Sequence, residues 1–398
     1  MLSKNYTSVR LEVTSHCNLN CEYCHNSEYS NRDNDMSTEE ILQLIANLKK
    51  RYDINKILIT GGEPLVNPDV SKIIQFITQL GIKADMVTNA TLLTPKLAIE
   101  LEKAGLKRIR ISIDDVQKGT SLRGEFEPNF LWEKARMITN CTSIEVCIHT
   151  VCSPSNVNQL FEVYKKVIEV GARRWRVFDI GFQGNVLKNL NKFKLEEYYQ
   201  NIIDSSKKII KDYLENGYKT VLDIEINNIF RTIMLEMQPS LSYDINSALQ
   251  RRLELSPCDY VADHQISIRS DGTATLCQYF HNTIFDFKKF NYDAIETVRN
   301  ARMVDEYEIL MKDLDYCSRC KYCLVCNSGC RARAKFLTGS IKDADPGACY
   351  LTKMVHKEII PLLPLNTQKA YNLCLNEKGT PPKYTITDLE TFLKEKGL

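Results

Sequence analysis

The chain has 398 residues, of which 43% are hydrophobic and 26% are charged, and its formal net charge at pH 7 is +2. This composition is ordinary for a soluble globular protein, and the length supports two compact domains with hydrophobic cores. Because the charge is nearly balanced, we expect neither nucleic acid nor a membrane surface as a partner. No apolar stretch is long enough for a transmembrane helix, and residues 1–6 lack the apolar core of a signal peptide. We therefore expect a cytoplasmic protein whose 15 cysteines are metal ligands or free thiols rather than disulfides.

Strand and helix periodicities alternate along the first half of the chain. Val9, Leu11 and Val13 alternate with polar residues and predict a strand over 8–14, while Ser37 and Glu40 form a capping box that starts a helix. Further strands are predicted at 56–60, 83–88, 107–113, 143–151 and 173–179, and further helices at 69–80, 95–104, 128–140 and 156–169. Six strands that alternate with helices predict a parallel sheet with right-handed crossovers. Six units are too few for a closed eight-unit barrel, so we expect an α/β fold built on an open, partial (β/α)6 barrel.

The second half of the chain differs in character. Residues 186–257 show mostly helical apolar spacing, whereas cysteines become dense and regular elements short from Cys258 onward. Ser270-Asp271-Gly272 lies between two short apolar runs, 266–269 and 273–276, and predicts a β-hairpin. Helices are expected at 296–312, after Cys349 and at 387–396. The sequence thus divides into a core domain at 1–190, a helical linker region at 191–257, a cysteine-rich domain with a β-hairpin and helices at 258–350, and a C-terminal helical tail at 351–398.

Three cysteines follow the first predicted strand closely. Cys17, Cys21 and Cys24 form C-x3-C-x2-C. Three thiolates at this spacing suit a [4Fe–4S] cluster that leaves one iron without a protein ligand. An open iron can chelate the amino and carboxylate groups of S-adenosylmethionine (SAM), a cofactor of radical chemistry. The alternative is a zinc site completed by His16 or His25, although zinc usually takes four ligands and only three thiols are local.

This cysteine spacing, with aromatic Tyr23 before the third cysteine, resembles the signature of the radical SAM superfamily. A second motif, Gly61-Gly62-Glu63-Pro64, ends the second predicted strand and resembles the sequence with which these enzymes hold the methionine ammonium of SAM. Glycines allow close backbone approach, and a carboxylate pairs with an ammonium group. The resemblance covers about residues 8–190 and implies SAM contacts at five later positions, each of which can equally be a turn or cap residue: Asn89, Ser112, Asp114, Arg123 and Asn156.

Membership of this superfamily implies a reaction class. The reduced cluster donates an electron to the sulfonium of SAM, which cleaves to methionine and a 5′-deoxyadenosyl radical, and the radical abstracts a hydrogen atom from the substrate. The chemistry of such barrels lies at the C-terminal ends of the strands. A reducing electron donor such as flavodoxin or ferredoxin is implied as a partner.

Seven further cysteines form a second array. Cys258-x13-Gly272-x4-Cys277 is followed by Cys317-x2-Cys320-x5-Cys326-x3-Cys330 and then by Cys349. This pattern resembles the SPASM domain of radical SAM enzymes, which usually holds two auxiliary [4Fe–4S] clusters, so the resemblance implies three clusters in all. A zinc ribbon is the alternative, but seven motif cysteines exceed the needs of one zinc site.

The family topology implies how these thiols are shared. Cys258, Cys277 and Cys330 would hold the first auxiliary cluster, and Cys317, Cys320, Cys326 and Cys349 would hold the second. The first auxiliary cluster then has only three evident ligands. Its fourth position is either open to substrate or filled by one of four nearby residues: Cys323, Asp259, Asp263 or His264.

Four cysteines fit neither array: Cys141, Cys147, Cys152 and Cys374. Cys147 and Cys152 bracket the fifth predicted strand, so one of them can point into the barrel. Some radical SAM epimerases use a thiol there as a hydrogen-atom donor. The alternative is that these cysteines are small buried hydrophobic residues.

Relatives that carry SPASM domains mostly oxidise or cross-link peptides and protein side chains. We therefore expect an oxidative modification, either a cross-link or a dehydrogenation, of a ribosomally made peptide. The first strand begins near residue 8, which leaves no room for an N-terminal peptide-recognition domain, so a separate protein or residues 186–257 would recognise the peptide. One alternative is a dehydrogenase or epimerase of a small molecule such as an aminoglycoside, sugar or nucleotide. The other is a non-catalytic iron–sulfur electron carrier or zinc-binding scaffold.

Overall fold

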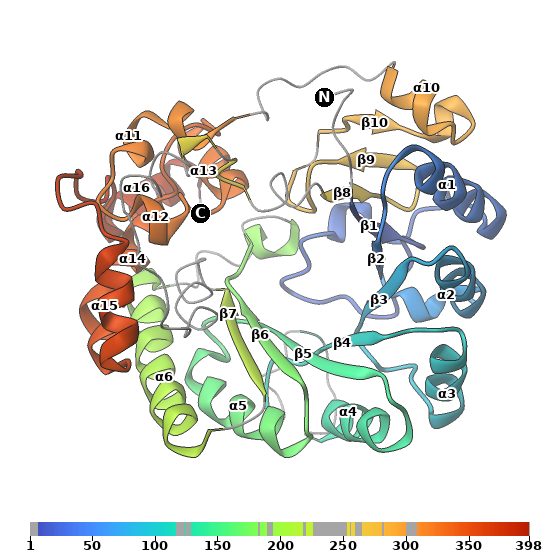
Figure 1. Cartoon of the computed structure of the whole chain (residues 1–398), viewed down its shortest axis with the longest axis horizontal. Helices are drawn as coiled ribbons and strands as arrows, with labels where there is room; N and C mark the ends of the chain where they lie inside the picture. The colour runs from blue at the N-terminus through green and yellow to red at the C-terminus, as the bar shows by residue number, and fades with distance from the viewer. Residues whose placement is uncertain are drawn as a thin grey trace.

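A single curved sheet organises the protein in the computed structural model (Figure 1). The structure describes residues 7–116, 123, 129–181, 184–188, 194–217, 220–225, 253–254, 256–258, 265–280, 282–299 and 309–397. The ten strands lie in the order β10-β9-β8-β1-β2-β3-β4-β5-β6-β7. Their bounds are β1 Ser8–Glu12, β2 Lys56–Thr60, β3 Lys83–Thr88, β4 Arg108–Ser112, β5 Glu145–Val151, β6 Arg174–Phe178, β7 Val221–Glu225, β8 Gln265–Ile268, β9 Thr273–Thr275 and β10 Phe285–Asp286.

Helices follow the strands and cover the outer face of the curved sheet in Figure 1. The barrel helices are α1 Thr38–Arg51, α2 Val70–Gln79, α3 Pro95–Lys103, α4 Phe130–Cys141, α5 Leu160–Glu169 and α6 Leu195–Asn216. The later helices are α10 Ala294–Arg299, α11 Asp315–Ser318, α12 Cys323–Cys326, α13 Arg331–Thr338, α14 Pro346–Glu358, α15 Leu365–Leu373 and α16 Ile386–Glu395. Among these, α14 and α16 pack against α6, so the C-terminal part of the chain lies beside the last helix of the barrel.

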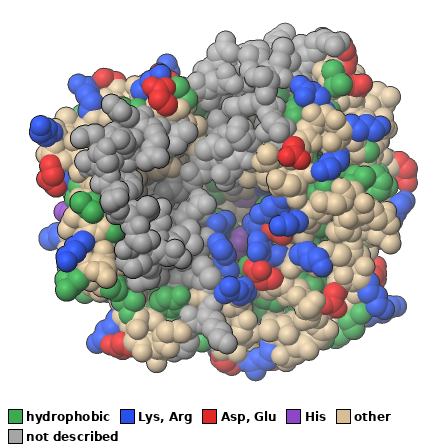
Figure 2. Space-filling model, viewed as in Figure 1, with side chains coloured by type: hydrophobic (Ala, Val, Ile, Leu, Met, Phe, Trp, Pro, Cys, Tyr) green, Lys and Arg blue, Asp and Glu red, His purple; other side chains and the backbone are tan. Residues whose placement is uncertain are grey.

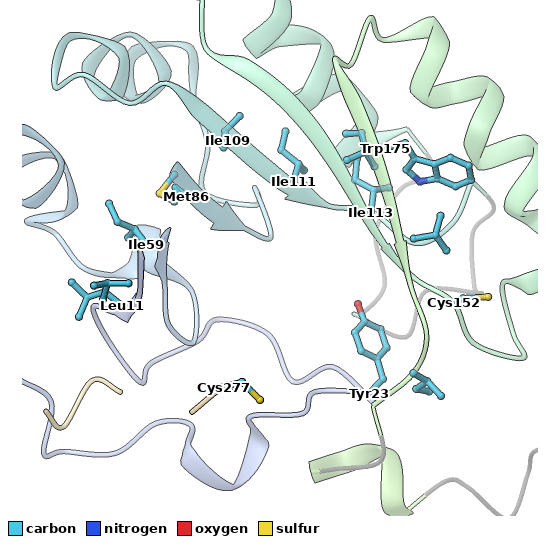
Figure 3. Close-up of a cluster of buried hydrophobic side chains, with 14 of the residues drawn as sticks. Leu11, Tyr23, Ile59, Met86, Ile109, Ile111, Ile113, Cys152, Trp175 and Cys277 are labelled. Atoms are coloured by element: carbon cyan, nitrogen blue, oxygen red, sulfur yellow. The ribbon is translucent and has the colours of Figure 1, made fainter. Parts of the chain in front are cut away.

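The predicted α/β fold with a parallel core is confirmed. Strands β1 to β6 are consecutive parallel neighbours, as right-handed βαβ units require. The reason lies in the period-two pattern of each strand, which sends apolar residues outward against the helices and polar residues inward. Figure 3 shows such buried side chains from successive strands, among them Leu11, Ile59, Met86, Ile111 and Trp175.

The sheet extends beyond the six predicted strands at both ends. Strand β7 pairs in parallel with β6 and lies inside the region predicted to be helical over 186–257, so that prediction is corrected here. The signal for a strand was present, because α6 stops at Gly217 in the left-handed conformation and the alternating run of β7 follows. At the other end, the predicted hairpin forms β8 and β9, and β8 pairs in parallel with β1. The hairpin is therefore part of the barrel sheet rather than a separate sheet.

Two helix predictions in the second half need adjustment. The start of the helix expected at 296–312 corresponds to α10, which begins at Ala294. The next part of the expected helix, 300–308, lies outside the described residues. Near its expected end, Met311–Asp313 forms a 3-10 turn. The helix expected after Cys349 is α14, which starts earlier, at Pro346, because Asp345 caps it. Within the described ranges, no helix is long and apolar enough to cross a membrane.

The capping box at the start of α1 offers a test of this local structure. Ser37 Oγ accepts from Glu40 N at 3.2 Å, and Glu40 Oε2 accepts from Ser37 N at 2.7 Å. Ser37→Ala removes one of these bonds and is expected to lower the free energy of unfolding by about 1 kcal/mol. Ser37→Thr keeps the cap and is the control. Urea unfolding measures both, and equal stability of the two variants would contradict this role of the cap.

Candidate metal and cofactor sites

The loop after β2 lies directly against the segment that leads into the first cysteine motif. Gly62 N donates to Thr14 O at 2.8 Å, and Glu63 N donates to His16 O at 2.8 Å. A Cβ atom on Gly61 would stand 2.4 Å from Thr14 O, and one on Gly62 would stand 2.3 Å from His16 O. The close approach that these glycines permit is therefore between two backbone segments of the protein itself.

The three thiols of the first motif lie near one another at the C-terminal end of β1. Burial raises the pKa of all three thiols, and a neighbouring thiol raises it further in each case: Cys24 for Cys17, Cys17 for Cys21 and Cys21 for Cys24. The Arg123 guanidinium acts in the opposite direction on each of them. The thiols and one cation thus form a single electrostatic cluster.

This donor set suits a cluster of irons better than a single ion. Within the described part of the chain, no three His, Cys, Asp or Glu side chains form a group that would hold one metal ion. Each thiolate of a [4Fe–4S] cluster binds a different iron, so its ligands stand farther apart than those around one ion. Three half-buried thiols without a fourth local cysteine fit such a cluster with one iron left for another ligand.

Glu63 lies beside the thiols of the first motif, and its residue is 1% exposed. Its Oε1 accepts from Thr88 Oγ1 at 2.6 Å and from Leu65 N at 3.1 Å, and its Oε2 accepts from Asn89 N at 2.6 Å. Burial raises the pKa of this carboxyl, and these hydrogen bonds oppose the shift. A carboxylate accepts about four hydrogen bonds, so Glu63 keeps capacity for one more donor.

Asn89, at the end of β3, is tied to the cysteine loop. Its Nδ2 donates to Asn18 Oδ1 at 2.9 Å, and its Oδ1 accepts from Thr91 N and Thr91 Oγ1. Asn18 directly follows Cys17. The side chain of Asn89 therefore fixes the position of the first motif relative to β3.

Tyr23, inside the cysteine motif, joins it to the end of β4. The Tyr23 hydroxyl donates to Asp114 Oδ2, and Arg123 Nε donates to the same oxygen at 2.5 Å. The Arg123 guanidinium also lies over the Tyr23 ring, 5.0 Å from its centroid. Asp114 Oδ1 accepts from Val151 N at 2.8 Å. This network places Arg123 near the three thiols and Asp114 near Cys21, and it gives Tyr23 a structural role that the motif alone did not indicate.

Asn156 and Ser112 are also at this edge of the sheet. Asn156 Nδ2 donates to Asp114 O at 2.9 Å and to Val151 O at 2.8 Å, while its Oδ1 accepts from Ser153 N at 2.8 Å. Both amide hydrogens are thus used within the protein, and the side chain joins the ends of β4 and β5. Ser112 is buried at the end of β4.

The cysteines of the second array fall into two groups. Burial raises the pKa of Cys277 well above its usual range, and the nearby Cys258 and Cys330 thiols raise it further. These are the three cysteines that the family topology assigns to one auxiliary cluster. Four residues were expected as candidates for the fourth ligand of this cluster. Three of them lie outside the described residues: Asp259, Asp263 and His264.

The second group surrounds one cavity. Its lining includes five thiols: Cys317, Cys320, Cys323, Cys326 and Cys349. Burial raises the pKa of Cys317 to about 12, and the neighbouring thiols, Cys323 among them, contribute to the rise. Cys323 is 2% exposed and belongs to this group. The structure therefore places Cys323 with the second set of thiols and not with the first.

Tyr279 connects the first motif with the nearer auxiliary thiols. Its ring lies 5.4 Å from the His25 ring, and a Cβ atom on Gly181 would stand 2.9 Å from it. Its backbone N donates to Cys277 Sγ at 3.4 Å. Burial raises the pKa of Tyr279 to about 12, and the thiol of Cys330 contributes to the rise. The sequence analysis did not single out Tyr279, although its position two residues after Cys277 was a signal.

Charged side chains line the inner face of the sheet. Arg10 pairs with Glu12 at 2.9 Å, Arg110 with Asp85 at 2.7 Å, and His149 lies among them. Burial and the surrounding arginines, Arg110 first, hold the pKa of His149 well below its usual range. Figure 2 shows Lys and Arg side chains gathered around a histidine near the middle of this face.

Cys147 lies within β5, and Cys152 directly follows the end of that strand. Cys147 shares the inner face with Glu145, and its Sγ lies 3.6 Å from Glu145 Oε1. Cys152 is fully buried in the hydrophobic core. Of these two cysteines, Cys147 is the one on the barrel interior.

The contact between Gly62 and His16 can be tested by adding one methyl group. Gly62→Ala places a Cβ atom against His16 O and is expected to lower the free energy of unfolding by roughly 1–3 kcal/mol. Gly217→Asn is the control, because nothing lies within 4 Å of the added Cβ and Asn tolerates the left-handed conformation. Urea unfolding compares them; a Gly62→Ala variant as stable as the control would show that the contact is dispensable.

Comparisons with known proteins agree with this architecture. Residues 11–127 match the model of the radical SAM superfamily. The Fe-coproporphyrin III synthase of Methanosarcina barkeri is 24% identical over 357 residues, which are 86% of this chain and 87% of that protein. The crystal structure of Streptococcus suis SuiB bound to the precursor peptide SuiA superposes with a TM-score of 0.61 at 15% identity, over 87% of this chain and 76% of that one. The structure of anSMEcpe with bound AdoMet and a Cp18Cys peptide superposes with a TM-score of 0.65 at 16% identity, over 92% and 99%. The family match identifies residues 11–127 as a radical SAM domain, and the solved structures share the fold of this chain.

Proposed function

We propose that this protein is a radical SAM enzyme with a SPASM-type C-terminal region that cross-links or dehydrogenates a ribosomally made peptide. The observation that carries the proposal is the position of Tyr279. Its ring contacts His25, next to the third cysteine of the first motif, while its backbone contacts Cys277 of the second array. A substrate at the end of the barrel would therefore lie near both sets of thiols.

The residues around the first motif would bind the cofactors. Cys17, Cys21 and Cys24 would hold a [4Fe–4S] cluster, and Glu63, with its remaining acceptor capacity, would hold the methionine ammonium of SAM. The Arg123 guanidinium lies within electrostatic reach of all three thiols and would balance negative charge there. When bound and reduced, these groups supply hydrogen-atom abstraction. A donor such as flavodoxin or ferredoxin would supply the electron.

The two later groups of thiols would hold auxiliary [4Fe–4S] clusters. Cys258, Cys277 and Cys330 would hold the one next to Tyr279, and Cys317, Cys320, Cys326 and Cys349 would hold the other. Abstraction of a hydrogen atom leaves one unpaired electron on the substrate. An oxidation then needs an acceptor for a second electron, which an iron–sulfur cluster near the barrel supplies.

A peptide substrate is supported by the solved structures with the same fold. SuiB is described with a precursor peptide and anSMEcpe with a Cp18Cys peptide. A separate protein that recognises the peptide is part of this proposal.

A small-molecule substrate is the second candidate, and two observations favour it. The alignment with Fe-coproporphyrin III synthase extends over 86% of this chain. In addition, His149 on the inner face of the barrel is surrounded by arginines, among them Arg110 and Arg176, a setting that suits a substrate with acidic groups.

Anaerobic turnover with SAM and a strong reductant tests the proposed function. Candidate peptides are expected to lose two hydrogen atoms in mass spectra: one passes to 5′-deoxyadenosine, and the other leaves as an electron and a proton. Oxidation of an acidic small molecule, with peptides unchanged, would favour the second candidate instead. No 5′-deoxyadenosine under any condition would contradict both.

Replacement of Cys17, Cys21 and Cys24 by Ala is the matched variant for that experiment. If the chain binds about twelve irons in three clusters, this variant is expected to keep about eight and to lose SAM cleavage. Cys141→Ala changes an exposed cysteine outside both arrays and is expected to keep all irons. SAM cleavage retained in the triple variant would disprove the assignment of the first motif.

The presence of five thiols around one cavity leads to a separate prediction. A [4Fe–4S] cluster takes four thiolates, so one thiol is surplus there. Under the family assignment Cys323 is the surplus thiol, and Cys323→Ser is expected to keep the iron content of the parent. Cys349→Ser is expected to lose about four irons. Iron and sulfide analysis measures both, and loss of iron from the Cys323 variant would show that this thiol is a ligand.

A further inference from the structure

A buried ion-pair network joins the C-terminal part of the chain to the barrel. Arg333 on α13 donates from Nε to Asp345 Oδ1 at 2.8 Å and to Asp345 Oδ2 at 3.0 Å. Its Nη1 donates to Asp179 Oδ2, just after β6. The three side chains are 8%, 0% and 11% exposed for Arg333, Asp345 and Asp179. One guanidinium thus lies between a buried and a partly buried carboxylate from parts of the chain far apart in sequence.

The Asp345 carboxylate accepts hydrogen bonds from the backbone at or next to one cysteine of each group of auxiliary thiols. Its Oδ2 accepts from Cys330 N at 2.7 Å, and its Oδ1 accepts from Ala348 N at 3.3 Å as the cap of α14, the helix that carries Cys349. Gly329 makes this arrangement possible, because a Cβ atom there would stand 2.5 Å from Asp345 Oδ2. A single carboxylate therefore positions the backbone at one cysteine of each group.

Asp179 anchors the other end of the network. Its Oδ1 accepts from Ile180 N at 2.8 Å and from the Tyr198 hydroxyl at 2.9 Å. Tyr198 lies on α6, and its hydroxyl oxygen is also 3.0 Å from Cys152 O, so its single proton is shared between the two acceptors. The carboxylate is thus fixed by β6, α6 and the loop after β5, and Gly181, which contacts Tyr279, is two residues away.

We propose that Arg333 is a positioning residue that couples iron binding by Cys330 and Cys349 to the docking of the C-terminal region on the barrel. Removing the cation leaves the buried Asp345 carboxylate and the partly buried Asp179 carboxylate without a counter-charge, which is costly in a low-dielectric interior. The carboxylates then separate, and the Cys330 loop and the start of α14 lose their fixed position. Because such coupling is reciprocal, iron at these cysteines also stabilises the docked barrel end. The iron part of the coupling rests on the proposed function, whereas the docking part rests on the ion pairs alone.

The test uses the full chain with Cys17, Cys21 and Cys24 replaced by Ala, so that only auxiliary iron is counted. Arg333→Met keeps most of the side-chain volume without the charge, and Asp179→Asn removes the charge at the barrel end, away from every cysteine of the second array. Both variants are expected to bind less than half of the iron that the triple-Ala chain, the parent in this experiment, binds. The apo forms are expected to melt roughly 5–10 °C lower. Arg333→Lys keeps the charge and is expected to recover part of the iron.

Hydrogen exchange distinguishes the proposed coupling from a role of Arg333 confined to the C-terminal region, because only the coupling changes exchange at the barrel end of the network. In the parent, iron loading is expected to slow exchange over 174–181 as well as over α13 and α14. In Arg333→Met, the slowing is expected to be lost at 174–181. Arg319→Met removes an exposed pair with Asp315 in the same region and is the control, with parent values expected throughout.

Three results would overturn the coupling. The first is parent iron content in both Arg333→Met and Asp179→Asn. The second is iron loss in Arg333→Met with parent iron in Asp179→Asn, because Arg333 would then act only within the C-terminal region. The third is unchanged protection of 174–181 in Arg333→Met. Failure of the proposed function gives a different result, because the parent itself would then bind no auxiliary iron.

Discussion

Two backbone hydrogen bonds, from Gly62 and Glu63 to the segment before Cys17, are the contact on which the candidate site depends. They require the loop after β2 to lie within bonding distance of the loop after β1, and only glycine permits this without a clash at positions 61 and 62. The close packing of these two loops places the Glu63 carboxylate next to the cysteine loop. Thr88 and Asn89 on the next strand then fix that carboxylate. The geometry of the site thus begins with the packing of neighbouring strand ends.

Burial without matching positive charge is the second constraint on these sites. Burial raises the pKa of cysteines in all three groups of thiols, so at neutral pH they favour the neutral thiol in the chain alone. Iron ligation requires the thiolate, and the metal itself supplies the charge that stabilises it. Arg123 is the cation closest to the first group, while Arg333 is held between carboxylates beside the second array. The protein therefore provides position and burial, and the inorganic group would provide the charge.

The continuity of the sheet brings the two cysteine arrays together. Because β8 pairs in parallel with β1, the hairpin turn after β8 lies at the same edge of the sheet as the first motif, and β9 runs back antiparallel to β8. Cys277 comes two residues after the end of β9, and Tyr279 beyond it contacts His25. At the other end of the sheet, α14 and α16 pack on α6, and Arg333 reaches Asp179 after β6. The C-terminal part of the chain is thus attached to both sides of the barrel.

Local signals in the sequence were enough to predict the alternation of strands and helices and the parallel core. Period-two strands, the Ser37 capping box and the Asp-Gly turn depend on residues close in sequence, and the structure confirms each of them. Strand β7 was missed because its five residues follow a long helical region, so that its weak alternating pattern was outweighed, and its pairing with β6 stabilises the extended form. The grouping of Cys323 with the second set of thiols, the contacts of Tyr279 and the Asp179–Arg333–Asp345 network join residues far apart in sequence. Spacing alone carries no information about such contacts. The sequence by itself therefore determined which chemistry the chain can support, whereas the tertiary structure decided which side chains meet, because burial and ion pairing depend on how the whole chain packs.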